Sequence, residues 1–444
     1  MEKQSASRSE QAPTSTIYSY YVLLVLTLVY MFSTVDRTLI SVLAEPIKAE
    51  FGLSDGQLGL LTGLAFAISY SIAGIPLGLL VDRVRRATLL ASLVTIWSGL
   101  TFLSGMATSA IALALARIGV GASEAGASPA SMSMITDYFP KERRGLALSI
   151  FYMSTPIGVA LTFSIGGAIA AAHGWHVAFF VAGGPGLVLA SLIFFTVREP
   201  IRGRFDPVES AEPAEHGEAP ERHRLRRAVG TLLSIRPLLY LLLAAVCVVI
   251  AQAGLGAFFS PFLIRVHEMS VAEAGYAIGA VKGPTGIIGL LAGGLVADQL
   301  AKRSLDGGIR IVGILMALAA AFAIATVTVP SWTLALALTG CFNFLNYTYY
   351  GATFATYMTL APVRMRGTLA GIFAVAMTMI GYGFGPPLAG LSSDLFASLG
   401  VVEPLRWALV VTASFFALGG LIFLHAAAAI KKLEHAGSGD HPAP

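Results

Sequence analysis

Residues 78–86 read GLLVDRVRR, and residues 294–303 read GLVADQLAKR. In both segments an Asp follows the first Gly by four positions, and basic residues come shortly after it. Each segment closes a long apolar run, so each marks the place where a helix of membrane-spanning length leaves the bilayer. Because the same boundary recurs in the second part of the chain, the sequence predicts two similar halves.

A second pair of segments supports this repeat. PKERRG (140–145) and PVRMRG (362–367) both have an Arg four positions and a Gly five positions after the Pro. Both fall between the fourth and fifth apolar runs of a half. Parallel repeats of six spans predict two helix bundles around a central cavity.

The composition is that of a helical membrane protein. Of the 444 residues, 56% are hydrophobic and 12% are charged, whereas soluble domains carry about 25% charged residues. Cys247 and Cys341 both lie in apolar runs. This placement favours neither a disulfide framework nor a cysteine metal site.

Apolar windows predict an all-α polytopic membrane protein with twelve transmembrane helices in two six-helix bundles. The predicted spans cover residues 20–44, 57–81, 88–107, 110–136, 146–171, 175–197, 237–264, 273–298, 309–329, 332–360, 367–392 and 405–430. The N-terminal bundle then covers 20–197 and the C-terminal bundle 237–430, with tails at 1–19 and 431–444. The polar linker between them, 198–236, is predicted to be solvated and flexible, with a short amphipathic piece at its start.

Basic residues predict the orientation in the membrane. They gather in the two tails, in the linker and in one set of loops, at Arg83, Arg85, Arg86, Lys141, Arg143, Arg144, Lys302, Arg303, Arg310, Arg364 and Arg366. The opposite loops hold Lys48, Arg265 and Arg406. Because strongly basic loops stay in the cytoplasm, both termini are predicted to be cytoplasmic.

Five charged residues lie well inside the predicted spans: Asp36, Arg37, Arg117, Glu124 and Lys282. A charge at the bilayer centre costs about 2.5–3.5 kcal/mol on insertion scales, so such residues are functional by default. Arg117 and Glu124 are seven positions apart, close to two turns, and therefore share one helix face. The structural alternative is that Asp36, Arg37 and Arg117 form a buried ion network that holds the first and fourth spans together.

Glu124 is the sharpest candidate for proton coupling. Its neighbours in GASEAGA (121–127) are small, so other helices can approach it and limit water. A carboxylate under the opposed influences of burial and a nearby Arg is suited to taking up and releasing a proton. Asp36, adjacent to Arg37, is the second candidate and is expected to exchange partners with the substrate or with the protonated state.

Arg37, Arg117 and Lys282 are predicted to meet an anionic group of a substrate. For Lys282 the alternative is nearly as strong, namely that its ammonium pairs with a neighbouring carbonyl. Aromatic residues of the seventh and tenth spans, among them Phe259 and Tyr347, are predicted to form the opposite wall. A charged wall that faces an aromatic wall would suit an amphiphile with a polar head and an apolar tail.

Charged residues at the cytoplasmic helix ends are predicted to act as a gate: Asp82, Arg83, Arg86, Arg144, Asp298 and Arg366. An Asp at a helix end can pair with an Arg or with a helix N-terminus of the other bundle when that side is closed. The alternative is that these residues belong to ordinary solvated loops.

With these features the sequence resembles the major facilitator superfamily. The resemblance rests on the six-plus-six arrangement and on GLLVDRVRR, in which Arg85 stands where the family usually has Gly. GYGFGPPLAG (381–390) loosely matches the family's Gly/Pro-rich signature. The resemblance implies the major facilitator fold and transport by alternating access, in which the two bundles rock about a central site.

Three segments are similar to the Spinster branch in a bacterial form: VDRTLISVL (35–43), RIGVGASEAGASPA (117–130) and DYFPKERRG (137–145). Members of this branch are linked to export of sphingosine-1-phosphate and to transport of lysophospholipids, and the bacterial forms are regarded as proton-coupled. The resemblance implies that Asp36, Arg37 and Glu124 make up the coupling site and that Arg117 is the branch's fourth-span arginine. It also implies a location in the bacterial inner membrane.

Two transport functions and a third class stay open. The first is proton-coupled movement of an amphiphilic lipid, such as a lysophospholipid or a sphingosine-phosphate-like molecule, and the second is proton-coupled movement of a small organic anion or a drug. A receptor or membrane enzyme is disfavoured because the sequence shows no nucleophile–base pair, metal cluster or sensory domain. We expect a monomer that binds substrate, protons and membrane lipids but no nucleic acid, and that uses the proton gradient instead of a cofactor.

Overall fold

The structure is a computed structural model that describes residues 16–205, 221–301 and 304–438. These residues form helices and loops without any strand, which confirms the all-helical prediction for the described part of the chain. The first half comprises α2 (Thr16–Val42), α3 (Ala44–Phe51), α4 (Asp55–Gly59), the π-helix η1 (Leu60–Leu64), α5 (Ala65–Arg83), α6 (Arg86–Ser104), α7 (Ala110–Glu124), α8 (Ala127–Tyr138), α9 (Lys141–Leu161), the π-helix η2 (Thr162–Gly166), α10 (Gly167–His173) and α11 (Trp175–Thr196). After α12 (Glu221–Ser234), the second half comprises α13 (Arg236–His267), α14 (Val271–Ala301), α15 (Leu305–Thr328), α16 (Trp332–Asn346), α17 (Tyr349–Leu360), the 3-10 helix η4 (Val363–Met365), α18 (Arg366–Val375), the π-helix η5 (Ala376–Tyr382), α19 (Gly383–Ser398) and α20 (Pro404–Ser438).

Ten helical stretches among the described residues are long and apolar enough to cross a membrane. They correspond to every predicted span except the eighth and the tenth, which are helical as α14 and as the pair α16 and α17. The chain is an integral membrane protein with many membrane-spanning helices. The count of twelve spans stays a prediction.

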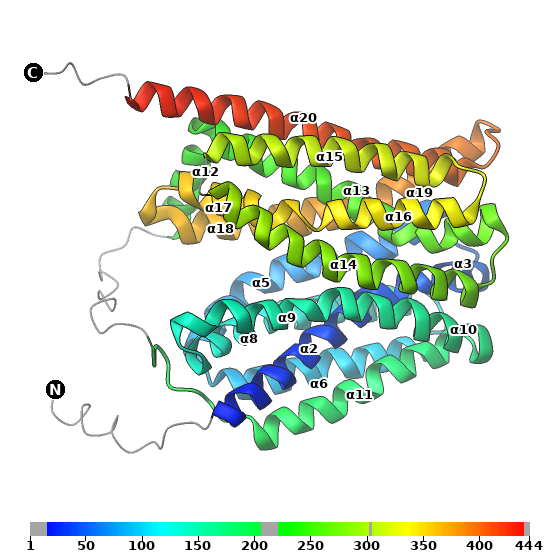
Figure 1. Cartoon of the computed structure of the whole chain (residues 1–444). Helices are drawn as coiled ribbons and strands as arrows, with labels where there is room; N and C mark the ends of the chain where they lie inside the picture. Colours follow the sequence, from blue (N-terminus) through cyan, green and yellow to red (C-terminus); the bar gives the residue numbers. More distant parts are fainter. Residues whose placement is uncertain (1–15, 206–220, 302–303, 439–444) are drawn as a thin grey trace, which may run out of the picture.

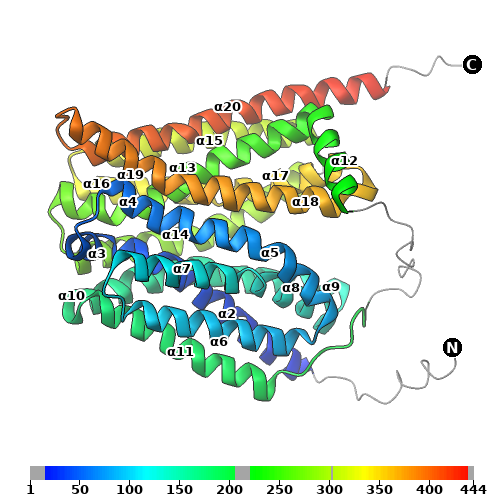
Figure 2. The same ribbon diagram turned by 180° about the vertical axis from the view of Figure 1, so that it is seen from behind.

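The two halves lie side by side as two bundles (Figure 1). In Figure 1 the first half runs from blue through teal to the green of α11, and the second half runs from the brighter green of α13 to red. α12 lies at the end of the molecule where α2 begins and α20 ends, which we call the linker end (Figures 1 and 2). α3, α4 and α10 lie at the opposite end, which we call the far end.

α12 lies in a different part of the linker from the predicted amphipathic piece. The sequence predicts that piece at the start of the linker, whereas the helix occupies residues 221–234, near its end. Ala228 and Leu232 are buried in the hydrophobic core of the second half. Helix formation is therefore stabilised where the linker can pack against α13 and α18.

The fourth and tenth predicted spans are interrupted in the same way. α7 and α8 contain 15 and 12 residues, and α16 and α17 also contain 15 and 12. The hydroxyl groups of Ser109 and Ser331 cap the first helix of each pair. Glu124 is the last residue of α7, and Asn346 is the last residue of α16. The repeat therefore extends to helix lengths, caps and breaks.

The halves pack against each other through four sets of helices. α4 and η1 contact α19; α5 contacts η5 and α19; α9, η2 and α10 contact α14; and α2 and α3 contact α13. Glycines allow the backbones to come close, because a Cβ on Gly275 would meet the carbonyl oxygen of Phe163, and one on Gly390 would meet that of Asp55. Small residues are a common means of joining helices in membranes. At the linker end, α8 and α17 pack chiefly on helices of their own half.

Candidate transport site

Glu124 ends α7 where the fourth span is interrupted, and its side chain is fully buried. Its Oε2 accepts hydrogen bonds from Arg37 Nε at 2.6 Å and from Ser33 Oγ at 2.9 Å. Its Oε1 has no hydrogen-bond partner. A buried polar atom without a partner costs free energy, so this carboxyl group gains from acquiring a new partner there.

Arg37 is the accessible charge of this cluster. Its side chain is 32% exposed although it lies within a membrane-spanning helix. The guanidinium lies over the rings of Phe66, at 5.2 Å, and Tyr70, at 4.9 Å, both on α5. It also lies near Tyr382 of the second half. Arg37 therefore joins the buried Glu124 to the surface between the two halves.

Asp36 and Arg117 are buried beside this pair. Neither forms an ion pair within the described part of the chain, although each interacts electrostatically with the other and with Glu124. Asp36 Oδ1 and two guanidinium nitrogens of Arg117, Nε and Nη1, lack hydrogen-bond partners. The direct ion pair between the first and fourth spans is Arg37–Glu124, and the other two charges stay unpaired beside it.

Lys282 lies on α14, on the opposite side of the interface between the halves. Its Nζ is 5.6 Å from the ring centroid of Phe163 in the first half and 5.4 Å from that of Phe259 in the second. Its ammonium makes no ion pair or hydrogen bond among the residues that the structure describes. Asn343 donates from Nδ2 to the Lys282 carbonyl at 3.1 Å and to Thr285 Oγ1 at 2.9 Å, which ties α16 to this part of α14.

The two predicted aromatic residues lie on different elements near α14. Phe259 is buried on α13 and stacks with Phe262 at 6.1 Å. Tyr347 lies at the break between α16 and α17, where Gly286 and Gly289 leave room for its ring. Both residues belong to the second half, as the sequence predicts.

The first half contributes aromatic residues that the sequence reasoning missed. Tyr30 stacks on Phe151 at 4.7 Å and meets Tyr152 edge-on at 6.1 Å. Tyr152 lies near Tyr350, and Arg37 and Tyr70 lie near Tyr382, in each case across the halves. Their spacing on different helices gave no sequence signal, because only the packing of α2, α5 and α9 brings them together. Tyrosines therefore line both sides of the interface.

Arg86 is held entirely within the first half. Its Nη1 donates to Asp137 at 2.6 Å and its Nε donates to Glu199 at 2.7 Å, and the side chain is buried. Asp82 and Arg83 are exposed at the end of α5, and the Asp82 carbonyl accepts a hydrogen bond from Arg202. Sequence reasoning missed these partners. Asp137 lies at the end of the fourth span, and Glu199 and Arg202 follow the sixth.

Arg144 and Arg366 make matching contacts in the two halves. Arg144 Nε donates to the Phe139 carbonyl at 3.2 Å, and Arg366 Nε donates to the Ala361 carbonyl at 3.4 Å. Each arginine thus binds a carbonyl five residues earlier, at the end of α8 or α17. The Asp298 side chain lies outside the described residues. The gate role of these charged residues stays a prediction.

Two similar helical halves with charged residues inside the membrane-spanning helices are typical of secondary transporters. The chain belongs to the Major Facilitator Superfamily, whose sequence pattern matches residues 26–386. It is therefore a transporter and not an enzyme, as the sequence predicts.

Several known transporters are similar to this chain, and they differ in the cargo or activity for which they are named. An MFS-type efflux pump of Mycolicibacterium smegmatis is 30% identical over 92% of each chain. The sphingosine-1-phosphate transporter SPNS2 of Danio rerio is 27% identical over 88% of this chain and 80% of that protein. The crystal structure of a bacterial homologue of the human lysosomal transporter Spinster, inward-facing and unoccupied, superposes with a TM-score of 0.80 at 29% identity, covering 94% of this chain and 98% of that chain. The predicted resemblance to the Spinster branch is confirmed.

Proposed function

We propose that this protein is a proton-coupled secondary transporter of an amphiphilic anionic lipid, of the lysophospholipid or sphingosine-phosphate kind, in the bacterial inner membrane. The observation that carries the proposal is the Arg37–Glu124 ion pair. Glu124 is fully buried and has one carboxylate oxygen without a hydrogen-bond partner, whereas Arg37 is partly exposed between the halves. A proton and an anion can therefore each replace one member of the same pair.

Protonation of Glu124 removes the charge that holds Arg37. The guanidinium then becomes free to bind an anionic group, while Asp36 and Arg117 can exchange partners with it. Conversely, an anion on Arg37 withdraws the cation that favours the ionised carboxylate. Proton binding and anion binding thus strengthen each other, because linkage between two sites is reciprocal. The expected consequence is that the proton and the anion move in the same direction.

The lipid class is supported by the surroundings of the two cations. Arg37 and Lys282 come from opposite halves, and both lie over aromatic rings. Arg37 lies near tyrosines of both halves, Tyr70 and Tyr382, which offer apolar faces together with hydroxyl groups. A headgroup on the cations and a tail along the rings would use both features. The similarity to a sphingosine-1-phosphate transporter supports the same class.

Uptake into proteoliposomes under an imposed pH gradient tests the proposal. A labelled lysophospholipid and a sphingoid phosphate are compared with small organic anions, in the wild type, in Glu124→Gln and in a control, Glu142→Gln, which removes an exposed carboxylate. We expect gradient-driven lipid movement in the wild type and the control, and its loss in Glu124→Gln. Lipid movement that keeps its gradient dependence in Glu124→Gln would contradict the assignment.

The second candidate is proton-coupled movement of a small organic anion or a drug. The 30% identical efflux pump favours it, and Arg37 and Lys282 would serve an anion of any size. In the same experiment, movement of small anions without movement of lipids would select this function. The coupling role of Glu124 would then be retained with a different cargo.

A further inference from the structure

α12 lies directly before a membrane-spanning helix. Ile235 alone separates it from α13, whose membrane span begins at Arg236. α12 also packs against α18, where another apolar span begins at Arg366. Figure 2 shows α12 running across the long helices of the second half and not along them. α12 is therefore placed at the level where these spans leave the bilayer, with its axis along the membrane surface.

One side of α12 is fixed to the protein. Ala228 and Leu232 are buried in the hydrophobic core of the second half. Thr231 Oγ1 donates to Met365 Sγ at 3.3 Å, which ties the helix to η4. These contacts determine which of the remaining sides of α12 face outward.

A second apolar side of α12 is left uncovered. Leu225, Val229 and Leu233 are 52%, 40% and 59% exposed. They follow one another at intervals of four positions and therefore form one stripe along the helix. Ala228 and Leu232 come three positions after Leu225 and Val229, so the buried stripe is the neighbour of the exposed one. The apolar side of α12 is thus wider than the surface that the fold covers.

Basic side chains accompany this stripe. Arg226 and Arg227 are exposed on α12, and Arg236 is exposed where α13 begins. A helix with an apolar stripe and arginines beside it is typical of helices that lie in the membrane interface. Its apolar side chains enter the boundary of the acyl chains, and its long basic side chains reach the headgroups. Positive charge at this level is complementary to anionic phospholipids.

The joint between α12 and α13 transmits the position of one helix to the other. Ile235 N donates to the Thr231 carbonyl at 2.9 Å, and Leu238 N donates to the Ile235 carbonyl at 2.9 Å. Hydrogen bonds thus run into the joint from one helix and out of it into the next. A contact that holds α12 consequently also holds the start of α13.

We propose that the exposed side of α12 docks on the bilayer and binds anionic phospholipids of the leaflet at the linker end. Leu225, Val229 and Leu233 enter the acyl boundary, and Arg226, Arg227 and Arg236 bind lipid phosphates. The second half is thereby anchored to one leaflet through α13. This surface lies outside the transport site, and its role does not depend on the cargo or on proton coupling.

Spin labels on single cysteines test which side of α12 enters the bilayer. Labels at Leu225→Cys and Leu233→Cys are compared with one at Ser234→Cys, which is exposed on the opposite side of the helix. The full chain, with Cys247 and Cys341 replaced by Ala, is placed in nanodiscs of phosphatidylcholine and phosphatidylglycerol. Power saturation gives the accessibility of each label to oxygen relative to a water-soluble nickel complex.

We expect this ratio to be about threefold or more higher at the two stripe positions than at Ser234→Cys. Equal ratios at the three positions would place the stripe in water and overturn the proposal. Protection of the stripe labels from both reagents would show that a protein covers it, and this result would overturn the proposal as well.

A double variant tests the anionic lipid. The label at Leu233→Cys is measured in nanodiscs with and without phosphatidylglycerol, in the parent, in Arg226→Gln with Arg227→Gln, and in a control. The control, Lys141→Gln with Arg143→Gln, removes two exposed basic residues at the start of α9. We expect phosphatidylglycerol to raise the oxygen-to-nickel ratio about twofold or more in the parent and the control, and to leave it unchanged in the arginine variant.

Two outcomes would reject the role of anionic lipid. One is a ratio in the parent that does not respond to phosphatidylglycerol. The other is a response in the arginine variant as large as that in the control, because the arginines of α12 would then not be the groups that bind the lipid.

Discussion

At the break of the fourth span the chain has Glu124, and at the equivalent break of the tenth span it has Asn346. Both side chains are buried, and each has a carboxyl or amide oxygen without a partner. An amide cannot take up a proton at ordinary pH, whereas a carboxylate can. The two halves therefore offer similar polar positions, of which only that in the first half is suited to proton coupling.

Proton uptake provides a direct test at this residue. If Arg37 is shared between Glu124 and an anionic ligand, ligand binding should draw a proton onto the carboxylate. We expect the purified wild-type protein to take up protons from a weakly buffered solution when the transported anion is added. Glu124→Gln should bind the anion without proton uptake. Equal uptake in both proteins would place the coupling proton elsewhere.

Lys282 offers a second residue-level prediction. Its ammonium lies between Phe163 and Phe259 without an ion-pair partner among the described residues, so a bound anion would meet a partly buried cation that no carboxylate neutralises. We expect Lys282→Met to weaken anion binding about tenfold or more, with Lys282→Arg restoring part of it. Arg310→Met, which removes a half-exposed charge of α15, is the control. Anion affinity is measured by calorimetry. If Lys282→Met bound the anion as tightly as the control variant, the assignment would be contradicted.

At the scale of elements, interrupted helices and close seams position the site. The breaks after α7 and α16 put Glu124 and Tyr347 at helix ends, where a side chain can leave the regular helix surface. π-helical turns interrupt the second, fifth and eleventh spans as η1, η2 and η5, and such turns often occur at functional sites. All three of these elements pack against helices of the other half. The bundles therefore meet along irregular helices.

Gly275 and Gly78 make a matched pair for testing the seam between α14 and η2. A Cβ on Gly275 would meet the Phe163 carbonyl and lie 3.2 Å from Gly167 Cα, whereas one on Gly78 would meet nothing within 4 Å. We expect Gly275→Ala to destabilise the protein by about 1–3 kcal/mol through overpacking. Gly78→Ala should be neutral or stabilising by up to about 1 kcal/mol, because Ala favours helix. Both variants are compared by their thermal unfolding and their transport activity. Equal stability and activity of the two variants would show that the seam tolerates the methyl group.

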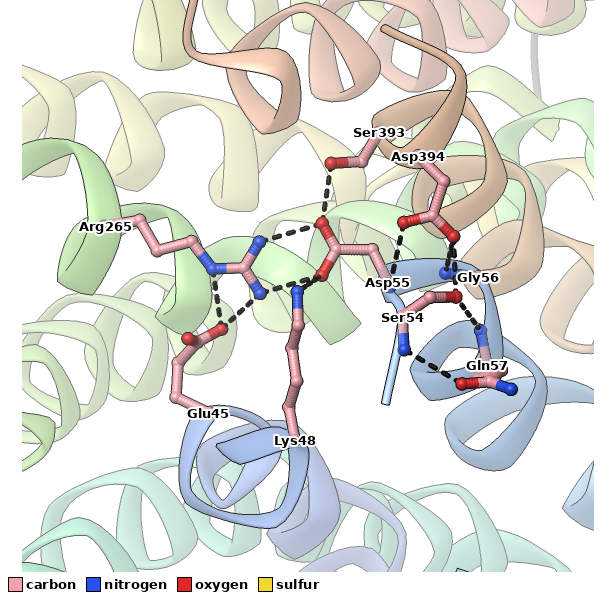
Figure 3. A network of polar contacts seen from close by, with 9 residues as sticks. All are labelled: Glu45, Lys48, Ser54, Asp55, Gly56, Gln57, Arg265, Ser393 and Asp394. Atoms are coloured by element: carbon pink, nitrogen blue, oxygen red, sulfur yellow. Dashed lines mark hydrogen bonds and ion pairs between the residues drawn. The ribbon is translucent and has the colours of Figure 1, made fainter. Parts of the chain in front are cut away.

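At the scale of the whole molecule, the two halves contact each other closely at the far end (Figure 3). Arg265 of the second half pairs with Glu45 and Asp55 of the first, and the glycine seams bring the backbones together. Rocking of the halves about the central cluster would separate these contacts. Cross-linking the far end should therefore stop the transport cycle.

A reversible cross-linker tests this expectation. In a background without Cys247 and Cys341, a short bis-thiosulfonate joins cysteines at Ser54→Cys and Asp394→Cys, whose native side chains are 2.7 Å apart across the halves. We expect transport to stop on cross-linking and to recover after reduction. The control joins Ser270→Cys and Glu273→Cys within the second half, where the native side chains are 2.8 Å apart. Transport that continues with the halves joined would exclude rocking at this seam.

The sequence by itself determined the class, the half-repeat and the unusual residues. Long apolar runs mark membrane helices because the bilayer leaves no other way to satisfy a spanning backbone, and buried charges stand out against them. The repeated motifs predicted matching halves, and Arg144 and Arg366 indeed make the same local contact. All these signals are local in the chain, so composition and spacing are enough to detect them.

Only the tertiary structure decided which distant residues meet. Glu124 pairs with Arg37 while the adjacent Asp36 stays unpaired, a choice that depends on helix rotation. Asp394 caps a helix that begins more than 300 positions earlier, with a sequence separation of 340 to Ser54. Arg265 and Lys48, which in the sequence mark only the loops with few basic residues, both pair with Asp55. Hydropathy fixes where each helix lies along the membrane normal, whereas side-chain packing between helices fixes its rotation and neighbours, and these contacts have no local pattern in the chain.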